Sequence, residues 1–422
     1  MAVCSVAGGM TAVALALAVV LAIRVYFHPE EAILTGPLYL MVCEIFLPSV
    51  SFLDFTAEPK EMYYWATGLL IITCAAFLRL GSKFIFKMPR SLLWYTLVAL
   101  ASSVWGAWNA AETSYVVRQL FGALLLSAYF VLAMRGVSEE KFLHTFRFYG
   151  VLGAIGFLLH YLLIFGEYGF HKELTSLPTQ CTILAIAFAA RSGWKWRVAT
   201  GMMLLPPVLD IMRRDWATFA LGVVLITAFT AANAWRRRAC WALAAIMVIA
   251  SLAPPIVDLM LQTATESSIL DRLMPEGTRN SDTVLEREMQ IVSAAAVLWS
   301  SPVLGTGMGS SFESWRAWGA GSTLDIPYVD NGWAHLAVKM GFAGILTFGW
   351  FIVNMAGWMP GRSPGLSASL LAMLLLGLFV EPVYFNFSTS PFLGAMAGLV
   401  YVGRKVEPTK DKVRMLALQG AH

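Results

Sequence analysis

Apolar residues in this chain come in blocks of about twenty, and this feature restricts the fold more than any other. A helix that rises 1.5 Å per residue needs about twenty residues to cross the hydrocarbon core of a bilayer. Unpaired backbone groups are costly in hydrocarbon, and uninterrupted apolar runs lack the alternation of a β-barrel strand. The sequence therefore predicts an all-α, polytopic integral membrane bundle.

The composition agrees with lipid as the solvent. Hydrophobic residues make up 58% of the chain and charged residues only 13%, whereas about 25% of residues in soluble domains are charged. The net charge of +4 lies mostly in short loops, so we expect no nucleic-acid partner. Neither a disulfide nor a zinc site is expected, because the five cysteines lie in or beside apolar blocks without paired spacing.

The positions of the blocks predict a single membrane domain over residues 1–422 with about 12–13 spans. Basic residues recur in every second loop, which places those loops in the cytoplasm of a bacterial, multi-pass inner-membrane protein. The other loops, including a large loop at 262–332, then face the periplasm. The N-terminus lies outside if all three early blocks span, and inside if one is re-entrant. The spans are expected near residues 6–26, 32–53, 62–80, 92–108, 116–134, 149–166, 178–190, 198–212, 216–235, 240–261, 333–358, 366–384 and 391–402.

The large loop is expected to contain an amphipathic helix near 283–300. Thr283 and Glu286 have the spacing of a capping box at its start. A glycine-rich run at 305–309 follows, where glycine permits positive φ and close approach of the backbone. The apolar stripe of the helix is predicted to consist of Leu285, Met289, Val292, Ala296 and Trp299.

Arg213 and Arg214 stand on the exterior side, against the preference for basic residues inside. An arginine fork matches the oxygens of a phosphate, so an anionic ligand is one interpretation. The alternative is an internal ion pair with Asp210 or Asp215. Arg287, in the loop helix, reads from composition alone as part of a solvated face with local ion pairs.

Polar and aromatic residues gather where the loop enters the next span. Asp330 and Asn331 place a carboxylate and an amide there. A carboxylate at this point either accepts a proton from a hydroxyl nucleophile or caps the following helix. The aromatic side chains nearby offer flat faces to sugar rings or form an interfacial belt; they are Trp315, Trp318, Tyr328 and Trp333.

The order of these features resembles the O-antigen ligase and polymerase family. The resemblance covers roughly residues 213–344. It rests on an arginine opening a span, an arginine in a loop helix, the run PVLGTGMG at 302–309, and Asp330-Asn331 followed after nine residues by GFAG at 341–344. It implies a GT-C-like fold and a metal-independent enzyme without a cofactor. Such an enzyme moves a glycan from undecaprenyl diphosphate to a glycan or lipid-linked acceptor hydroxyl at the periplasmic face.

The resemblance also implies roles for individual residues. Arg213, or Arg214 after a one-residue slip, and Arg287 would bind the diphosphate and stabilise charge on the leaving group. Asp330 stands where the ligases have a histidine that is thought to act as the base, which favours a polymerase over a ligase.

Four further residues are candidate substrate contacts. His335 lies more than one helical turn beyond Asp330, so it is a poor substitute for the missing base. It is grouped with Asn331, Trp315 and Tyr328 as a residue that lines the binding site.

The alternative function is a flippase or transporter of lipid-linked oligosaccharides. Transporters of this kind often contain inverted repeats with broken helices in matched positions. The sequence has no matching repeat, and a large exterior loop with arginine and carboxylate side chains suits surface chemistry better.

Overall fold

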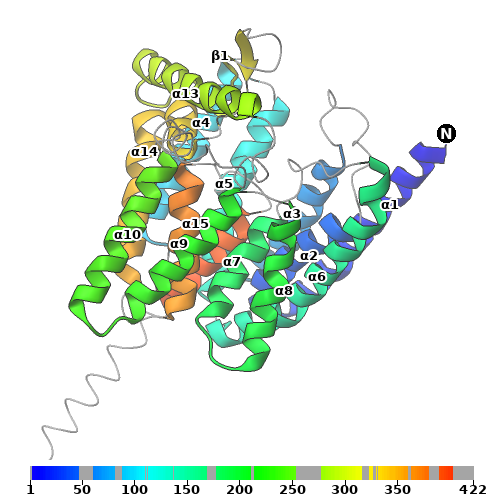
Figure 1. Ribbon diagram of the computed structural model, residues 1–422. Helices are drawn as coiled ribbons and strands as arrows, with labels where there is room; N and C mark the ends of the chain where they lie inside the picture. Colours follow the sequence, from blue (N-terminus) through cyan, green and yellow to red (C-terminus); the bar gives the residue numbers. More distant parts are fainter. Residues whose placement is uncertain are drawn as a thin grey trace, which may run out of the picture.

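Figure 1 shows a computed structural model of the protein, which is built almost entirely from helices. The apolar blocks of the sequence fall on helices, which confirms that the chain is helical. The structure describes residues 2–46, 60–80, 88–109, 111, 113–135, 137–168, 177–210, 213–252, 277–315, 323–326, 329, 331–359, 363–379 and 389–402.

The helices that precede the large loop form most of the bundle. They are α1 (Ala2–Phe27), the short 3-10 helix η1 (Pro29–Glu31), α2 (Ala32–Phe46), α3 (Lys60–Leu80), α4 (Arg90–Trp108), α5 (Thr113–Ala133), α6 (Glu139–Tyr168), α7 (Leu177–Ala189), α8 (Trp194–Asp210), α9 (Arg213–Thr230) and α10 (Ala234–Leu252). The loop and the following chain contain α13 (Gly277–Ser300), β1 (Phe312–Trp315), β2 (Thr323–Ile326), α14 (Gly332–Trp358), α15 (Pro364–Phe379) and the helix Ser390–Val402.

Two of the described helices are long and apolar enough, by length and composition, to cross a membrane. They are Tyr115–Ala133, within α5, and Gly332–Trp358, which is α14. Shorter apolar helices are Ala12–Phe27, Trp65–Leu80, Thr179–Ala189, Asp215–Thr230, Met289–Ser300, Pro364–Leu375 and Ser390–Val402.

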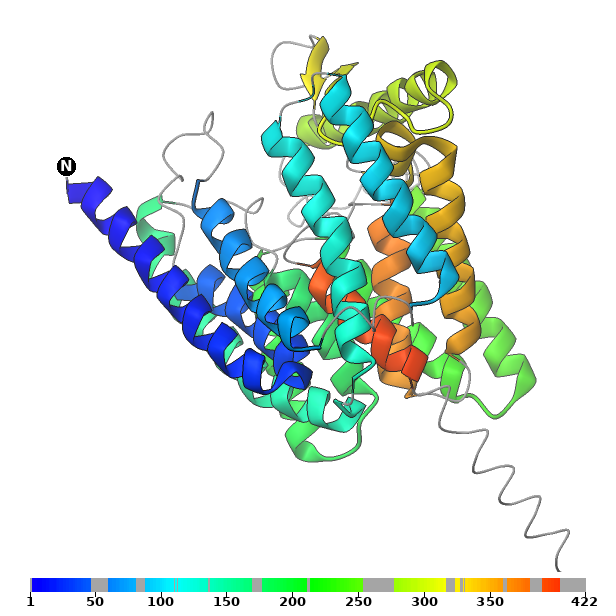
Figure 2. The same ribbon diagram turned by 180° about the vertical axis from the view of Figure 1, so that it is seen from behind.

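Ion pairs hold several basic segments together at one end of the bundle. Glu31 accepts a hydrogen bond from Arg24 Nε at 2.8 Å, and its carboxylate lies 3.7 Å from Lys141 Nζ. Arg191, at the α7–α8 turn, pairs with Glu139 at 2.9 Å. Figures 1 and 2 show the α7–α8 and α9–α10 turns at this end, and α13 with β1 at the opposite end. We call these the basic end and the loop end.

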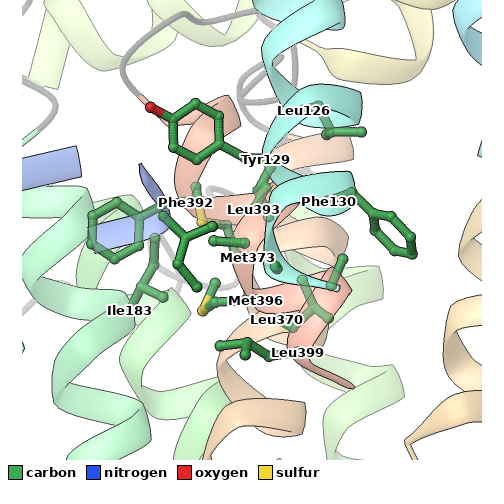
Figure 3. Close-up of a cluster of buried hydrophobic side chains, with 14 of the residues drawn as sticks. Leu126, Tyr129, Phe130, Ile183, Leu370, Met373, Phe392, Leu393, Met396 and Leu399 are labelled. Carbon is green, nitrogen blue, oxygen red and sulfur yellow. The ribbon is translucent and has the colours of Figure 1, made fainter. Parts of the chain in front are cut away.

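A buried apolar cluster joins the first half of the bundle to the last helices. Figure 3 shows Phe130 of α5, Leu370 of α15 and Phe392 of the helix Ser390–Val402 within this cluster. The helices approach closely at Gly398, where a Cβ atom would lie only 2.6 Å from the carbonyl oxygen of Phe130. Small residues that permit such close approach are typical of helix packing in membranes.

Candidate functional site

The candidate site lies in the chain between α10 and α14, at the loop end of the bundle. α13 lies across this end, roughly perpendicular to the bundle helices (Figures 1 and 2), and packs against α14 and β1. β1 and β2 pair antiparallel, with Phe312 opposite Ile326 and Trp315 opposite Thr323. The loop segment therefore folds onto the start of α14, where several of the expected site residues lie.

A tight turn at residues 301–310, which we call the glycine turn, connects α13 to β1. Gly305, Gly307 and Gly309 have φ values of 61°, 93° and 79°, in the left-handed region that favours glycine. A Cβ on any of the three would collide with backbone atoms of α14, α4 or α5. The expected positive φ and close backbone approach are therefore confirmed.

Hydrogen bonds connect the glycine turn to three different helices. The Met308 N–H donates to the carbonyl oxygen of Ser102 in α4 at 3.1 Å. The Gly309 N–H donates to Oε1 of Gln119 in α5 at 2.8 Å. The Thr306 N–H donates to the carbonyl oxygen of Val338 in α14 at 2.8 Å. The turn thus holds the ends of α4, α5 and α14 in one arrangement.

α14 is broken at Gly341, whereas the sequence predicts one span over residues 333–358. Gly341 has φ 60° and ψ −157°, which are not helical. The two parts bend toward each other, so that the Trp333 ring lies 3.8 Å from where a Cβ on Gly349 would be. The second part of α14 runs along the bundle, whereas the first part packs among the loop elements (Figure 1).

The glycine turn supplies the hydrogen bonds that this break removes from α14. In a continuous helix the amides of residues 342 and 343 would donate to the carbonyls of residues 338 and 339. Here the amides donate instead to the carbonyls of Pro302 and Val303, at 2.8 and 3.2 Å. The freed carbonyls accept from the Thr306 N–H and from the Ser102 hydroxyl. No backbone group at these four positions is left unpaired, as an apolar environment requires.

Lys339 is a buried cation that sequence reasoning missed. Its side chain has no exposed surface, and its ammonium group donates a hydrogen bond to the carbonyl oxygen of Ser310. Among the described residues, no carboxylate lies within ion-pair distance of it. Burial of an ammonium group costs several kcal/mol unless it is well compensated. The sequence feature that could have identified it is a lysine inside an apolar block, because charged residues in membrane-spanning segments are rare and usually functional.

The first turn of α14 is fixed by Asn331 and His335. Oδ1 of Asn331 accepts a hydrogen bond from the Ala334 N–H at 2.9 Å, which makes Asn331 the N-cap. The N-cap that was one interpretation of Asp330 is therefore Asn331. His335 is buried, and its Nδ1 accepts a hydrogen bond from the Val329 N–H at 3.2 Å.

Arg213 and Arg214 are the first two residues of α9, at the loop end of the bundle. The next residue, Asp215, is buried, and its Oδ1 accepts a hydrogen bond from Thr179 Oγ1 at 3.0 Å. This contact attaches the first turn of α9 to α7. α9 also packs against α10 and α15.

α13 differs from the expected loop helix in two respects. It begins at Gly277, so Thr283 lies inside the helix and cannot form the predicted capping box. The predicted apolar stripe does not face the protein at Val292, Ala296 and Trp299, which are exposed. The inward face includes Gln290 and Ala294, which are buried, and Val297, which packs against a small apolar cluster with Phe312 and Val338.

The structure describes only some of the remaining predicted residues. Asp330 and Tyr328 lie outside the described residues. Trp315 ends β1, and Arg287 lies within α13. The loop assembly therefore brings Arg287, Trp315, Asn331 and His335 onto neighbouring elements, while Arg213 and Arg214 come from a helix whose main packing partners are α7, α10 and α15.

Comparison with known proteins finds a family match for one part of the chain. Residues 211–349 match the family model described as O-Antigen ligase. No curated protein and no solved structure matches the chain. The matched stretch contains α9, α13, the glycine turn and the break in α14, so it covers Arg213, Arg287 and Asp330. The match confirms the resemblance of residues 211–349 to the O-antigen ligase and polymerase family, and it supports a membrane glycosyltransferase in general.

Proposed function

We propose that this protein transfers a glycan from undecaprenyl diphosphate to an acceptor hydroxyl at the periplasmic face of the bacterial inner membrane. The observation that carries the proposal is the family match over residues 211–349, which contains every residue to which we assign a chemical role. The glycine turn and the broken helix α14 give this stretch a fixed backbone at the loop end.

The orientation follows from the distribution of basic residues. The basic end carries Arg24, Lys141, Arg191 and the arginines at the start of α10, so we infer that it is cytoplasmic. Arg24 lies in the last turn of α1, so α1 begins at the loop end. We infer that the chain forms one membrane domain with thirteen passes, with the loop at 262–332 and the N-terminal end of α1 in the periplasm.

Arg213 and Arg287 are assigned to the diphosphate. Its departure as a dianion is the difficult part of the displacement at the anomeric carbon, so fixed positive charge assists it. Each well-placed donor is worth on the order of 3 kcal/mol, by analogy with the removal of oxyanion-hole donors. Arg214, which follows Arg213 in the first turn of α9, is assigned a supporting contact.

Asp330 is assigned the role of the base that orients or deprotonates the acceptor hydroxyl. The capping role beside it is taken by Asn331, so the helix start does not account for a carboxylate at this position. The ligases have a histidine at this point, so an aspartate favours a polymerase. Trp315 and Tyr328 are assigned to the sugar rings. His335 is assigned to holding Val329, next to Asp330.

The function is tested with purified protein and a lipid diphosphate oligosaccharide in detergent. Release of the free lipid diphosphate and growth of the glycan are followed for the wild type and for Arg213→Ala, Arg287→Ala and Asp330→Ala. Arg236→Ala, at the exposed basic end, is the matched control. We expect turnover without added metal, and strong loss of turnover in the three site variants only. Turnover that survives all three substitutions would refute the site.

The choice between polymerase and ligase needs a second acceptor. The same donor is offered either a second lipid-linked glycan or a lipopolysaccharide core. Elongated lipid-linked products support a polymerase. Exclusive transfer to the core shows a ligase, and it contradicts the inference that an aspartate at position 330 favours a polymerase.

A further inference from the structure

The second half of α13 presents an apolar face to its surroundings. Residues 289–300 contain no charged side chain, whereas the first half of the helix carries five. Trp299 is 78% exposed and Val292 61% exposed, and Ile291 is also exposed. A surface helix in contact with water normally has charged and polar residues on its outer face. This outer face therefore does not suit water.

The inner face of the same helix is already occupied. Ala294 and Val297 belong to a small apolar cluster with Phe312, Val329 and Val338. Gln290, also on this side, is buried. These contacts fix the rotation of α13, so Val292 and Trp299 cannot turn inward without displacing side chains that pack against β1 and α14.

The outer face of α13 is continuous with an apolar surface on α14. The turn after α13 carries Val303, which is 68% exposed and whose carbonyl accepts a hydrogen bond from the Ala343 N–H. The neighbouring Phe342 begins an exposed row on the second part of α14. That row continues through Leu346, Trp350 and Val353.

We propose that the second half of α13 lies in the outer interfacial layer of the bilayer, with its apolar face in the lipid. Three observations carry this inference: the uncharged outer face, the crosswise position of α13 over the bundle end (Figures 1 and 2), and the continuity with the exposed row of α14. Amphipathic helices bind membranes in this orientation, and tryptophan prefers the interfacial layer.

The inference has a consequence for the proposed site, although it does not depend on transferase activity. Arg287 lies one helical turn before Ile291 on α13. A helix anchored in the interfacial layer holds this part of the chain at the depth of lipid headgroups. A lipid-linked diphosphate would occupy the same depth.

The test measures how deeply α13 enters the bilayer. Four full-length variants each carry one environment-sensitive fluorescent amino acid, which replaces Val292, Trp299, Leu346 or Glu313. Each protein is placed in lipid nanodiscs that contain phosphatidylcholine with a nitroxide either near the headgroup or near the chain end. Leu346, on the exposed row of α14, is the deep reference, and Glu313, exposed on β1, is the aqueous reference.

We expect the probes at positions 292 and 299 to lose fluorescence mainly to the nitroxide near the headgroup. The probe at 346 should be quenched mainly by the nitroxide near the chain end, and the probe at 313 by neither. If the probes at 292 and 299 behave like the one at 313, the inference is overturned. The inference is also overturned if the nitroxide lipids do not quench the probes at 292 and 299 but their fluorescence changes with the number of protein copies in each nanodisc. That result would indicate contact between two chains.

Discussion

The ammonium group of Lys339 donates a hydrogen bond to the carbonyl oxygen of Ser310 from a side chain with no exposed surface. This contact joins the first part of α14 to the end of the glycine turn, directly before β1. The backbone carbonyl of Lys339 takes part as well, because it accepts from the Ser102 hydroxyl of α4. One residue thus connects three elements that meet at the loop end.

Lys339→Met should therefore destabilise the protein less than Lys339→Ala. Methionine fills most of the volume but leaves the Ser310 carbonyl without its donor, at a cost of about 1–3 kcal/mol. Alanine leaves a cavity as well, and truncations of buried long side chains cost about 2–5 kcal/mol. The unfolding temperatures of both variants are measured in detergent. Equal unfolding temperatures for the two would show that packing of the lysine stem is unimportant.

Gly307→Ala should lower the unfolding temperature markedly. Its φ of 93° already disfavours alanine, by about 1–2 kcal/mol. A Cβ would in addition collide with the backbone of Gly106 in α4. Gly357→Ala is the control, because a Cβ there meets no atom within 4 Å and alanine stabilises a helix interior by about 0.5–1 kcal/mol. A tolerated Gly307→Ala would mean that the turn is not packed against α4.

Asp330→Asn and Asn331→Ala should affect different properties. Loss of a general base typically reduces turnover by about 10²- to 10⁴-fold, so Asp330→Asn should lower activity while the unfolding temperature stays unchanged. Asn331→Ala removes the N-cap of α14 and should cost about 0.5–2 kcal/mol of stability. Turnover and thermal unfolding are measured on both proteins. Stability lost in Asp330→Asn with normal turnover would assign Asp330 a structural role.

Glu31 should make stability depend on pH at the basic end. The hydrogen bond from Arg24 lowers the pKa of the Glu31 carboxyl below its usual range. A carboxyl group whose pKa is lowered by folding stabilises the folded protein fully at pH values above its pKa in the unfolded chain, which is about 4.3. This stabilisation is lost as the pH falls through the pKa of the group in the folded protein. Glu31→Gln should therefore flatten the acid side of a plot of unfolding temperature against pH. Identical acid slopes in both proteins would contradict this role.

The helices follow from the sequence because hydrocarbon demands paired backbone groups, so an apolar block of sufficient length has few alternatives. The packing face of α13 does not follow in this way. Apolar residues occupy both of its faces, and Val292 and Trp299 point outward while Gln290 points inward. Periodicity identifies an apolar face but not which neighbour covers it.

The partners of Lys339 and the break at Gly341 do not follow from the sequence, for a related reason. Both depend on hydrogen bonds to residues 302–310, and such long-range partners leave no local pattern. The candidate site residues Arg213, Arg287 and Asp330 could be predicted from the order of motifs along the chain. Their distances from one another depend on three-dimensional packing that motifs do not encode.

The break in α14 constrains the order of assembly during biosynthesis. The amides of Phe342 and Ala343 donate to the carbonyls of Pro302 and Val303, which leave the ribosome earlier and, in the proposed orientation, cross the membrane first. Until that segment folds back, the entering helix carries unpaired groups, which hydrocarbon tolerates poorly. Insertion of α14 and closure of the glycine turn are therefore a single, mutually dependent step.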